Sequence, residues 1–277
     1  MSALPIAIMS RDRADALVIV AKPPEPGMVK TRLASVIGPQ RAADLYRAFL
    51  GDLAERFGAA QGVGHYDLRW SCAPGRHTPE AAFEALRGVV GCAGEVFLQR
   101  GANFAERLYQ IACDCRAAGY RRLVISSSDS PHLPTDAVAD AFAALDGADV
   151  ALGPAEDGGY YLIGLWLNRQ PATPPDLFRG IRMSTATVCA ETLARARALG
   201  LAATLLAPTF DIDEPPDLAR LWDTLRHADE RLAPRTRLAL AGLLPAIAPA
   251  ALLPARPDAV SAPQTGRSSH EQEISRK

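Results

Sequence analysis

The 277-residue sequence has few aromatic residues, almost no net charge and no long apolar run. Aromatic residues make up 6% of the chain, so a base-stacking surface for single-stranded nucleic acid is not expected. The 30 basic and 31 acidic residues give a formal net charge of −1, whereas nucleic-acid-binding proteins carry a strong basic excess. No run reaches the ~18 apolar residues of a membrane span, and the first residues lack the pattern of a signal peptide. We expect a cytoplasmic protein with no nucleic-acid partner and no membrane span.

Cysteine and histidine are also sparse, with five of each. The cysteines include no C-x-x-C pair, and the histidines show no metal-ligand spacing. We interpret the cysteines as small buried side chains in a reducing compartment, and we expect no zinc site. Two glycine-rich phosphate-binding patterns, the Walker A loop and the Rossmann G-x-G-x-x-G, are absent as well.

The sequence does have enough apolar residues, 48%, to form a full core, and its pattern alternates between strand and helix. This alternation predicts a mostly parallel sheet with helices on both faces, a three-layer α/β/α fold. The expected strands are 16–21, 67–72, 95–98, 122–126, 149–152, 159–167 and 203–206. The expected helices are 39–57, 79–86, 104–118, 135–145, 184–199, 215–225 and 235–247, and the fifth of them is capped by Ser184 or Thr185.

We expect one domain over residues 16–247. Residues 1–15 form an N-terminal extension in this interpretation. Residues 248–277 are rich in proline and polar residues, lack aromatics, and are predicted to be a disordered tail. In parallel α/β sheets the ligands bind beyond the carboxyl ends of the strands, so residues that follow a strand are the first candidates for a site.

The segment after the first strand, AKPPEPGMVKTRL (21–33), carries three basic residues and one acidic residue. Its prolines stiffen the loop and Gly27 allows close backbone approach, so the cations can be held for a phosphate chain. A solvated basic loop is the alternative interpretation. The candidate nucleotide- or phosphate-binding residues are Lys22, Gly27, Lys30, Thr31 and Arg32.

A single carboxylate, Asp129, follows the buried strand 122–126 in the segment SSSDSPHLP. Mg²⁺ usually takes only one or two protein carboxylates and leaves its other positions to water and phosphate. Asp129 is therefore a candidate catalytic metal ligand. The alternative is that Asp129 only organises the turn before the next helix. We assign no role to His132.

The segment GPAEDGGYYLIGL (153–165) places Asp157 at the same predicted sheet edge as Asp129. Asp157 is a candidate catalytic residue, either as a general base or as a hydrogen-bond partner of the metal's ligands. The glycines leave room for an acceptor, which makes Gly158, Gly159 and Tyr160 candidate acceptor-side residues. An ordinary Asp-Gly-Gly turn is the alternative.

The segment FDIDEPPDL (210–218) contains two further candidate metal ligands, Asp211 and Asp213, which strand alternation would put on one face. Equally, the acidic residues here begin a helix. Asp217 is best explained as support for the positive end of that helix dipole.

These four segments, in this order, resemble a bacterial family of GT-A-like transferases, often called rSAM/selenodomain-associated transferase 1, within the nucleotide-diphospho-sugar transferase superfamily. The resemblance covers residues 16–225. The chain is more distantly similar to 2-phospho-L-lactate and molybdenum-cofactor guanylyltransferases. The resemblance implies a GT-A-like fold, donor phosphates held by Lys22, Lys30 and Arg32, a metal-binding Asp129, and an acceptor beside Asp157-Gly158-Gly159.

Three hypotheses about function follow. The first is an Mg²⁺- or Mn²⁺-dependent glycosyltransferase that moves a sugar from a nucleotide-activated donor to a small-molecule acceptor. The metal and the basic loop would stabilise the diphosphate leaving group. The second is a nucleotidyltransferase that joins an NTP to a phosphorylated small molecule and releases pyrophosphate. The third is a non-catalytic nucleotide-binding protein. The sequence leaves the nucleobase, the acceptor and the oligomeric state open.

Overall fold

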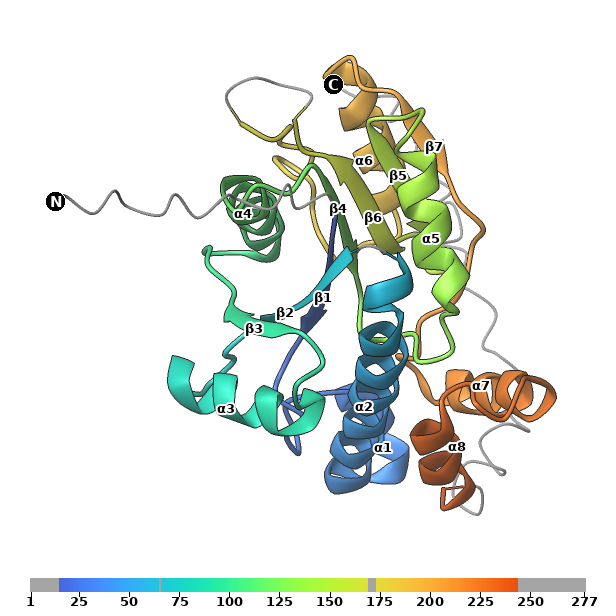
Figure 1. Ribbon diagram of the computed structural model, residues 1–277. Helices are drawn as coiled ribbons and strands as arrows, with labels where there is room; N and C mark the ends of the chain where they lie inside the picture. Colours follow the sequence, from blue (N-terminus) through green and yellow to red (C-terminus); the bar gives the residue numbers. More distant parts are fainter. Residues whose placement is uncertain (1–14, 65, 169–172, 244–277) are drawn as a thin grey trace, which may run out of the picture.

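The computed structural model describes residues 15–64, 66–168 and 173–243. A seven-stranded sheet, in the order β3-β2-β1-β4-β6-β5-β7, runs through the middle of the molecule (Figure 1). The strands are β1 (Asp15–Ala21), β2 (Tyr66–Cys72), β3 (Glu95–Leu98), β4 (Arg122–Ser126), β5 (Val150–Pro154), β6 (Tyr160–Trp166) and β7 (Ala203–Leu205). The helices are α1 (Thr31–Ile37), α2 (Pro39–Gly64), α3 (Pro79–Val90), α4 (Phe104–Ala117), α5 (Thr135–Ala144), α6 (Val188–Ala198), α7 (Pro215–His227) and α8 (Pro234–Ala241).

The sheet is mostly parallel, as predicted. Strand β6 alone among the described strands runs against its neighbours, β4 and β5, while the other pairs are parallel. The carboxyl ends of β1, β4 and β5 and the start of β6 therefore lie at one edge of the sheet. The loops that leave this edge carry the candidate site residues.

Helices cover both faces of the sheet, which confirms the three-layer α/β/α fold. In β1 the side chains of Leu17 and Ile19 enter one core cluster, and those of Ala16 and Val18 enter the other. The first cluster packs under α2, α3, α5 and α7, and the second packs under α4 and α6. Such alternation explains why β1 is apolar along its whole length.

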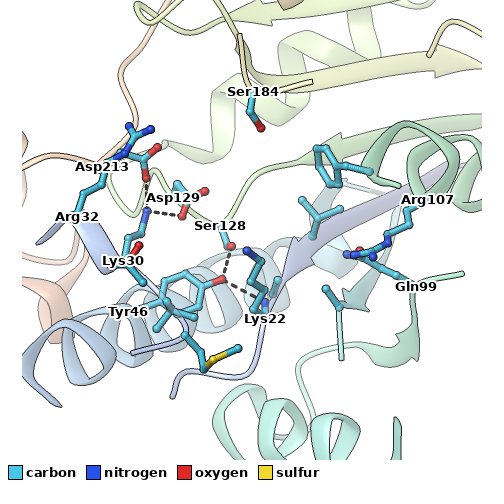
Figure 2. Close-up of a pocket in the computed structure, with 17 residues that line it drawn as sticks. Lys22, Lys30, Arg32, Tyr46, Gln99, Arg107, Ser128, Asp129, Ser184 and Asp213 are labelled. Atoms are coloured by element: carbon cyan, nitrogen blue, oxygen red, sulfur yellow. Dashed lines mark hydrogen bonds and ion pairs between the residues drawn. The ribbon is translucent and has the colours of Figure 1, made fainter. Parts of the chain in front are cut away.

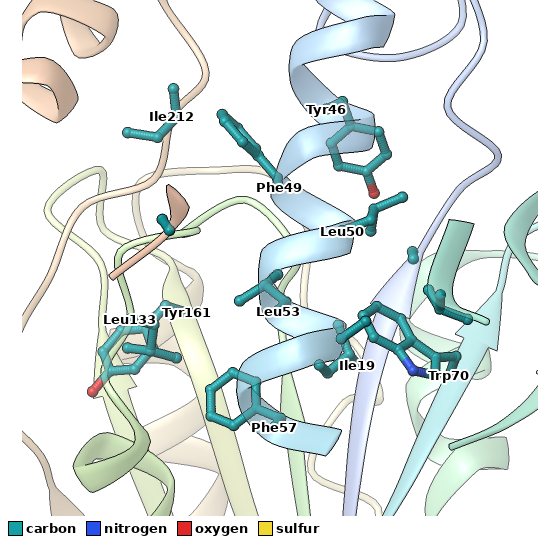
Figure 3. Close-up of a cluster of buried hydrophobic side chains, with 14 of the residues drawn as sticks. Ile19, Tyr46, Phe49, Leu50, Leu53, Phe57, Trp70, Leu133, Tyr161 and Ile212 are labelled. Atoms are coloured by element: carbon teal, nitrogen blue, oxygen red, sulfur yellow. The ribbon is translucent and has the colours of Figure 1, made fainter. Parts of the chain in front are cut away.

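Helix α2 forms the centre of the larger cluster (Figure 3). Its apolar side chains recur at three- and four-residue spacing and pack between the sheet and the segment that contains Ile212. Those labelled in the figure are Tyr46, Phe49, Leu50, Leu53 and Phe57. Because Tyr46 lies near the end of this row at the sheet edge, the core also fixes one wall of the site.

Two local predictions are wrong. Residues 31–33 are not loop: they begin the short helix α1, which ends at Gly38, a residue with φ +85°. Helix α6 begins at Val188, with Thr187 before it, rather than at residue 184. Ser184 instead has φ +65°, a left-handed conformation that no residue of an α-helix adopts.

The predicted extension 1–15 lies outside the described residues except for Asp15, which is the first residue of β1, and the predicted tail 248–277 lies outside them entirely. All five cysteines are free. Cys72 and Cys115 are buried as expected, whereas Cys92 is exposed. Across the described helices, none combines the length and apolar character needed to cross a bilayer.

Candidate active site

The loop after β1 delivers Lys30 to the sheet edge. A turn closed by a hydrogen bond from the Met28 N–H to the Glu25 carbonyl contains Gly27, whose φ of +75° suits glycine. Lys30 follows as the residue before α1 and is itself left-handed, with φ 46° and ψ 44°. A non-glycine residue in this region is strained by about 1 kcal/mol, so surrounding contacts must hold it there.

Those contacts come from two other loops. The Lys30 ammonium forms an ion pair with the Asp129 carboxylate and a second one with Asp213 at 2.9 Å. It also donates a hydrogen bond to the Ile212 carbonyl at 2.7 Å. Only 4% of the Lys30 side chain is exposed. Lys30 and Asp129, predicted from the sequence to act at one site, are in direct contact (Figure 2).

The charge of Lys30 is stable in this position. Burial lowers its pKa, but the carboxylates of Asp129 and Asp213 more than offset that effect, and the pKa is raised overall. The buried ammonium therefore stays protonated at every physiological pH. It fixes the loop of Asp129 and the segment of Asp213 against the loop that follows β1.

A second contact network lies beside this pair. The Tyr46 hydroxyl is 2.7 Å from the Ser128 hydroxyl, and it accepts a hydrogen bond from the Lys22 N–H at 3.3 Å. Burial and the nearby charge of Asp129 raise the pKa of Tyr46, so the phenol stays neutral. Tyr46 lies within the predicted helix 39–57, and nothing in the sequence indicated this polar role.

These residues line a cavity of about 490 Å³, the first cavity, at the carboxyl edge of the sheet. Four basic side chains and two acidic side chains lie on its wall. Figure 2 shows Lys30, Arg32 and Asp213 towards one end, and Gln99 and Arg107 towards the other. The charged residues on the wall are Lys22, Lys30, Arg32, Arg107, Asp129 and Asp213.

The basic residues of the first cavity differ in what they contact. Lys30 is fully engaged by its two carboxylates, whereas Lys22 is exposed and has no ion pair with any described residue. Arg32 lies 3.3 Å from Glu214, and both side chains are exposed. Thr31 lines the cavity as well, but Gly27 does not. A phosphate group entering here would find Lys22 available.

Gln99 and Arg107 were missed from the sequence. The Gln99 side chain donates from Nε2 to the Ser71 carbonyl at 3.0 Å, which leaves its Oε1 buried without a partner among the described residues. Such an acceptor on a cavity wall suits a ligand N–H or O–H. A signal was present, since Gln99 follows directly after the predicted strand 95–98.

A second cavity, of about 220 Å³, adjoins the first. Asp129 and Ser184 line both cavities. Asp157 and Asp211 line the second one, together with the predicted acceptor-side residues Gly159 and Tyr160. Gly158 lines neither cavity.

The turn between β5 and β6 explains the position of Asp157. Its Oδ1 accepts a hydrogen bond from the Gly159 N–H at 2.8 Å. Gly158, with φ +87°, lies so close to the backbone of the 184–187 loop that a Cβ would be 2.0 Å from the Ala186 carbonyl oxygen. The reason for glycine at 158 is therefore this close approach between two loops rather than room for an acceptor.

Arg220 holds the same turn from the other side. Its guanidinium donates two hydrogen bonds of 2.6 Å to the Glu156 carboxylate and stacks on the Phe210 ring at 3.7 Å. The ring of His132 also stacks on Phe210, with 4.2 Å between the ring centroids. Burial, followed by the charges of Arg56 and Arg220, lowers the pKa of His132 to about 4. This is a packed, neutral histidine, to which the sequence analysis assigned no role.

The expectation that Asp211 and Asp213 share one face of a strand is wrong. The segment is joined to the sheet by an isolated bridge between Ala155 and Thr209, and it is not a strand at 211–213. Asp213 therefore faces Lys30 and the first cavity, while Asp211 lines the second. Asp217 accepts hydrogen bonds from the N–H groups of Asp213 and Glu214, at 2.9 and 2.7 Å, and so acts at the start of α7.

The carboxylates that could bind a metal are Asp129 and Asp211. Both line the second cavity, and burial, followed by the charge of Asp129, raises the pKa of Asp211 to about 6. Ser130 donates a hydrogen bond of 2.6 Å to Asp211. In the described part of the chain no cluster of three or more His, Cys, Asp or Glu side chains could hold a metal. Two carboxylates fit the Mg²⁺ pattern in which phosphate and water complete the shell.

The strand order, with β6 as the antiparallel member, and a cavity at the carboxyl edge define a GT-A-like fold of the nucleotide-diphospho-sugar transferase type. Residues 59–185 match the family described as an uncharacterized protein conserved in bacteria (DUF2064). A candidate nucleotide-diphospho-sugar transferase from Desulfovibrio desulfuricans G20 is 33% identical, with a TM-score of 0.75 over 85% of this chain and 97% of that one. With this identity over most of both chains, together with the family match, the chain belongs to the bacterial DUF2064 family.

Two other solved structures are less similar. A cytidylyltransferase from Leptospira borgpetersenii has a TM-score of 0.49 and 11% identity, over 84% of this chain and 95% of that one. A nucleotidyl transferase from Methanothermobacter thermautotroptrophicus has a TM-score of 0.46 and 15% identity, over 78% of this chain and 99% of that one. No protein of curated function matches the chain. The narrower rSAM/selenodomain-associated name stays a prediction.

Proposed function

We propose that this protein is a metal-dependent glycosyltransferase that takes its sugar from a nucleoside-diphospho-sugar and passes it to a small-molecule hydroxyl. One observation carries this proposal: Asp129 lines both a cavity with four basic side chains and a cavity with no basic side chain among its described lining residues. Asp129 also forms an ion pair with Lys30, which lines the first of these cavities. Two resemblances support the same activity. The four ordered motifs resemble the rSAM/selenodomain-associated transferase 1 group, and the Desulfovibrio relative is described as a candidate nucleotide-diphospho-sugar transferase.

The larger cavity suits the nucleotide part of the donor. Its size of about 490 Å³ is in the range of small-molecule and cofactor sites. Lys22 and Arg32 are placed to contact the phosphates, and Lys30 holds Asp129 in position beside them. At the other end, Gln99 Oε1 accepts a hydrogen bond from the nucleoside.

Asp129 and Asp211 would bind the divalent cation in this proposal, and Asp213 would remain the partner of Lys30. When bound with the donor, the cation neutralises negative charge that builds up on the diphosphate leaving group. Lys22 and Arg32, on the wall of the first cavity, would act on the same charge. Preorganised charges of this kind supply most of the catalysis when little covalent chemistry is needed.

The reaction balances without another reactant. The acceptor oxygen forms a bond to the anomeric carbon, and the bond from that carbon to the diphosphate oxygen breaks. The leaving nucleoside diphosphate keeps the electron pair. Asp157, which is exposed at the second cavity, takes the proton from the acceptor hydroxyl as general base.

A nucleotidyltransferase is the second candidate. The four basic side chains of the first cavity favour it, because a triphosphate carries more charge than a sugar diphosphate. In that reaction an acceptor phosphate would attack the α-phosphate of an NTP and release pyrophosphate.

Product analysis tests the proposal. The purified full chain is incubated with Mg²⁺ and either a panel of nucleotide sugars or the four NTPs, with small alcohols as acceptors, and both nucleoside diphosphate and pyrophosphate are measured. Release of nucleoside diphosphate from a nucleotide sugar is the expected result. Release of pyrophosphate would establish the second candidate instead.

The control is the Asp129→Asn variant, checked for a normal unfolding transition. It should lose product formation in the presence of Mg²⁺. If the wild-type protein binds nucleotides in a parallel thermal-shift assay but forms neither product with any donor, it is a non-catalytic binding protein and the proposal is wrong.

A further inference from the structure

The two cavities differ in the charges on their walls. The first carries four basic side chains, Lys22, Lys30, Arg32 and Arg107. The second carries three carboxylates, Asp129, Asp157 and Asp211, and no basic side chain among its described lining residues. A ligand that reaches both cavities therefore meets cations along one part and carboxylates along the other.

The remaining wall of the second cavity is mostly apolar. Its apolar side chains come from β1, β4, β6, α4 and the 183–188 segment. The hydroxyl residues among the lining are Ser126, Ser127, Tyr160, Tyr161, Ser184 and Thr185. At about 220 Å³ it is larger than a cavity of about 150 Å³ that holds benzene. The principal apolar lining residues are Phe104, Leu108, Ile125, Ile163, Met183 and Val188.

This arrangement is built by backbone contacts and is not a loose surface hollow. The 184–187 loop approaches Gly158 closely, and the Cys189 N–H donates a 3.0 Å hydrogen bond to the Gly158 carbonyl. The Glu156–Arg220 pair holds the other side of the same turn. Asp157 is thus fixed at the rim of an apolar cavity.

We infer that the second cavity binds the acceptor, and that this acceptor is an uncharged or positively charged alcohol with a small apolar body, not a phosphate ester. The inference rests on the proposed function and names the substrate class for it. In the proposed function the cation held by Asp129 and Asp211 would be bound to the donor diphosphate, which leaves Asp157 as the free carboxylate of the cavity. A phosphate monoester here would lose its hydration beside Asp157 with no basic side chain among the described lining residues to pair it, and like charges brought together without solvent are strongly disfavoured. An ammonium group would be attracted by Asp157.

The inference also favours glycosyl transfer over the second candidate. A nucleotidyltransferase of the kind considered above needs a phosphorylated acceptor beside the α-phosphate of its NTP. The second cavity, which adjoins the first at Asp129, has no basic side chain among its described lining residues and so disfavours that acceptor class. A hydroxyl beside Asp157 satisfies both the charge of the cavity and the proton balance of the glycosyl transfer.

Three probes that share one apolar body test this inference: 2-phenylethanol, 2-phenylethylamine and 2-phenylethyl phosphate. Their binding to the full chain is measured by ligand-observed NMR with Mg²⁺ and saturating inorganic pyrophosphate, which occupies the basic first cavity and keeps the phosphate ester out of it. We expect the alcohol and the amine to bind at least tenfold more tightly than the phosphate ester.

Two variants show whether the second cavity is responsible. Met183→Trp narrows it and should weaken the binding of the alcohol at least tenfold without changing pyrophosphate affinity. Thr185→Lys adds a cation to its wall and should bring the affinity of the phosphate ester to within a few-fold of the alcohol. Equal binding of alcohol and phosphate ester to the wild type, or binding of none of the probes, overturns the inference.

The inference and the proposed function fail separately. If neither pyrophosphate nor any nucleoside diphosphate binds, the proposed function is wrong, whatever the three probes do. If these anions bind and displace each other, and the phosphate ester still enters the second cavity, only the assignment of the acceptor class is wrong.

Discussion

The ammonium of Lys30 contacts the carboxylate of Asp129, joining the loops that follow two neighbouring parallel strands, β1 and β4. This ion pair is also part of the wall between the donor and acceptor regions of the proposed site. Lys30 therefore has two functions, since it keeps Asp129 in position and contributes positive charge to the first cavity.

The first prediction concerns the stability that this pair provides. Lys30→Met removes the charge, leaves Asp129 and Asp213 without their cation, and should lower the free energy of unfolding by about 2 kcal/mol. The loss is smaller than for a fully buried pair because both carboxylates are partly exposed, 37% and 49%. Urea denaturation measures it.

A double-mutant cycle with Asp129→Asn isolates the pair itself. Asp129→Asn should lower the free energy of unfolding less in the Lys30→Met background than in the wild type, which gives a coupling energy of about 1–3 kcal/mol. Additive effects of the two substitutions would show that the contact contributes nothing to stability.

The second prediction concerns donor phosphates. Lys22→Ala should weaken nucleoside diphosphate binding by about 1.5–3 kcal/mol, roughly 10- to 150-fold, because Lys22 is exposed on the wall of the first cavity and has no ion pair with any described residue. Titration calorimetry at low and high salt measures this. Arg41→Ala is the matched control, since Arg41 is exposed on α2 and does not line the cavity. Equal affinity of both variants would contradict the role of Lys22.

A third prediction follows from the packing of Gly158. Gly158→Ala should lower the free energy of unfolding by about 2 kcal/mol or more, because the new Cβ meets the Ala186 carbonyl and the φ of +87° disfavours alanine. In Gly88→Ala the new methyl group has no neighbour within 4 Å, so this helix variant should be unchanged or about 1 kcal/mol more stable. If thermal unfolding shows the two variants to be alike, the close approach is not real.

The fourth prediction is a pH dependence of stability from His132. Its pKa falls from 6.5 in the unfolded chain to about 4 in the folded protein, so the unfolded chain takes up the proton first as the pH drops. The free energy of unfolding therefore falls as the pH drops from about 6.5 to about 4. The loss from pH 7 to pH 5 attributable to His132 is about 2 kcal/mol.

His132→Phe keeps a ring against Phe210 and cannot titrate in this range. The variant should show a shallower decline in the free energy of unfolding between pH 7 and pH 5. At pH 8 His132 is neutral in both the folded and the unfolded state, so the difference in stability between variant and wild type at that pH measures the effect of the substitution on packing. A decline as steep as in the wild type would assign the acid sensitivity to other groups.

Much of the fold could be predicted because strand and helix leave strong local patterns. The strands 95–98 and 122–126 were predicted at their exact bounds, and the rule that ligands bind beyond strand ends brought Lys30 and Asp129 together correctly. What failed depends on tertiary contacts. The helix α1 is short and follows three prolines. Lys30 takes a left-handed conformation that is held by its contacts with Asp129, Asp213 and the Ile212 carbonyl.

The candidate site was predicted less completely for the same reason. Asp211 and Asp213 face different cavities because their segment crosses the sheet edge as irregular chain, which alternation along a strand does not describe. Ser184 lines both cavities, although its sequence context is that of a helix start. Gln99 owes its importance to the Ser71 carbonyl that orients its amide, a contact between strands that no local pattern contains.

The central claim is that Asp129 joins a donor phosphate chain to a divalent cation, and nucleoside diphosphate affinity measured with and without Mg²⁺ tests it most directly. Calorimetry on the wild type and Asp129→Asn, both checked for normal unfolding, should show an affinity gain of at least tenfold with Mg²⁺ in the wild type and little or none in the variant. The same Mg²⁺-dependent gain in both proteins, or no nucleoside diphosphate binding by the wild type, would contradict the claim.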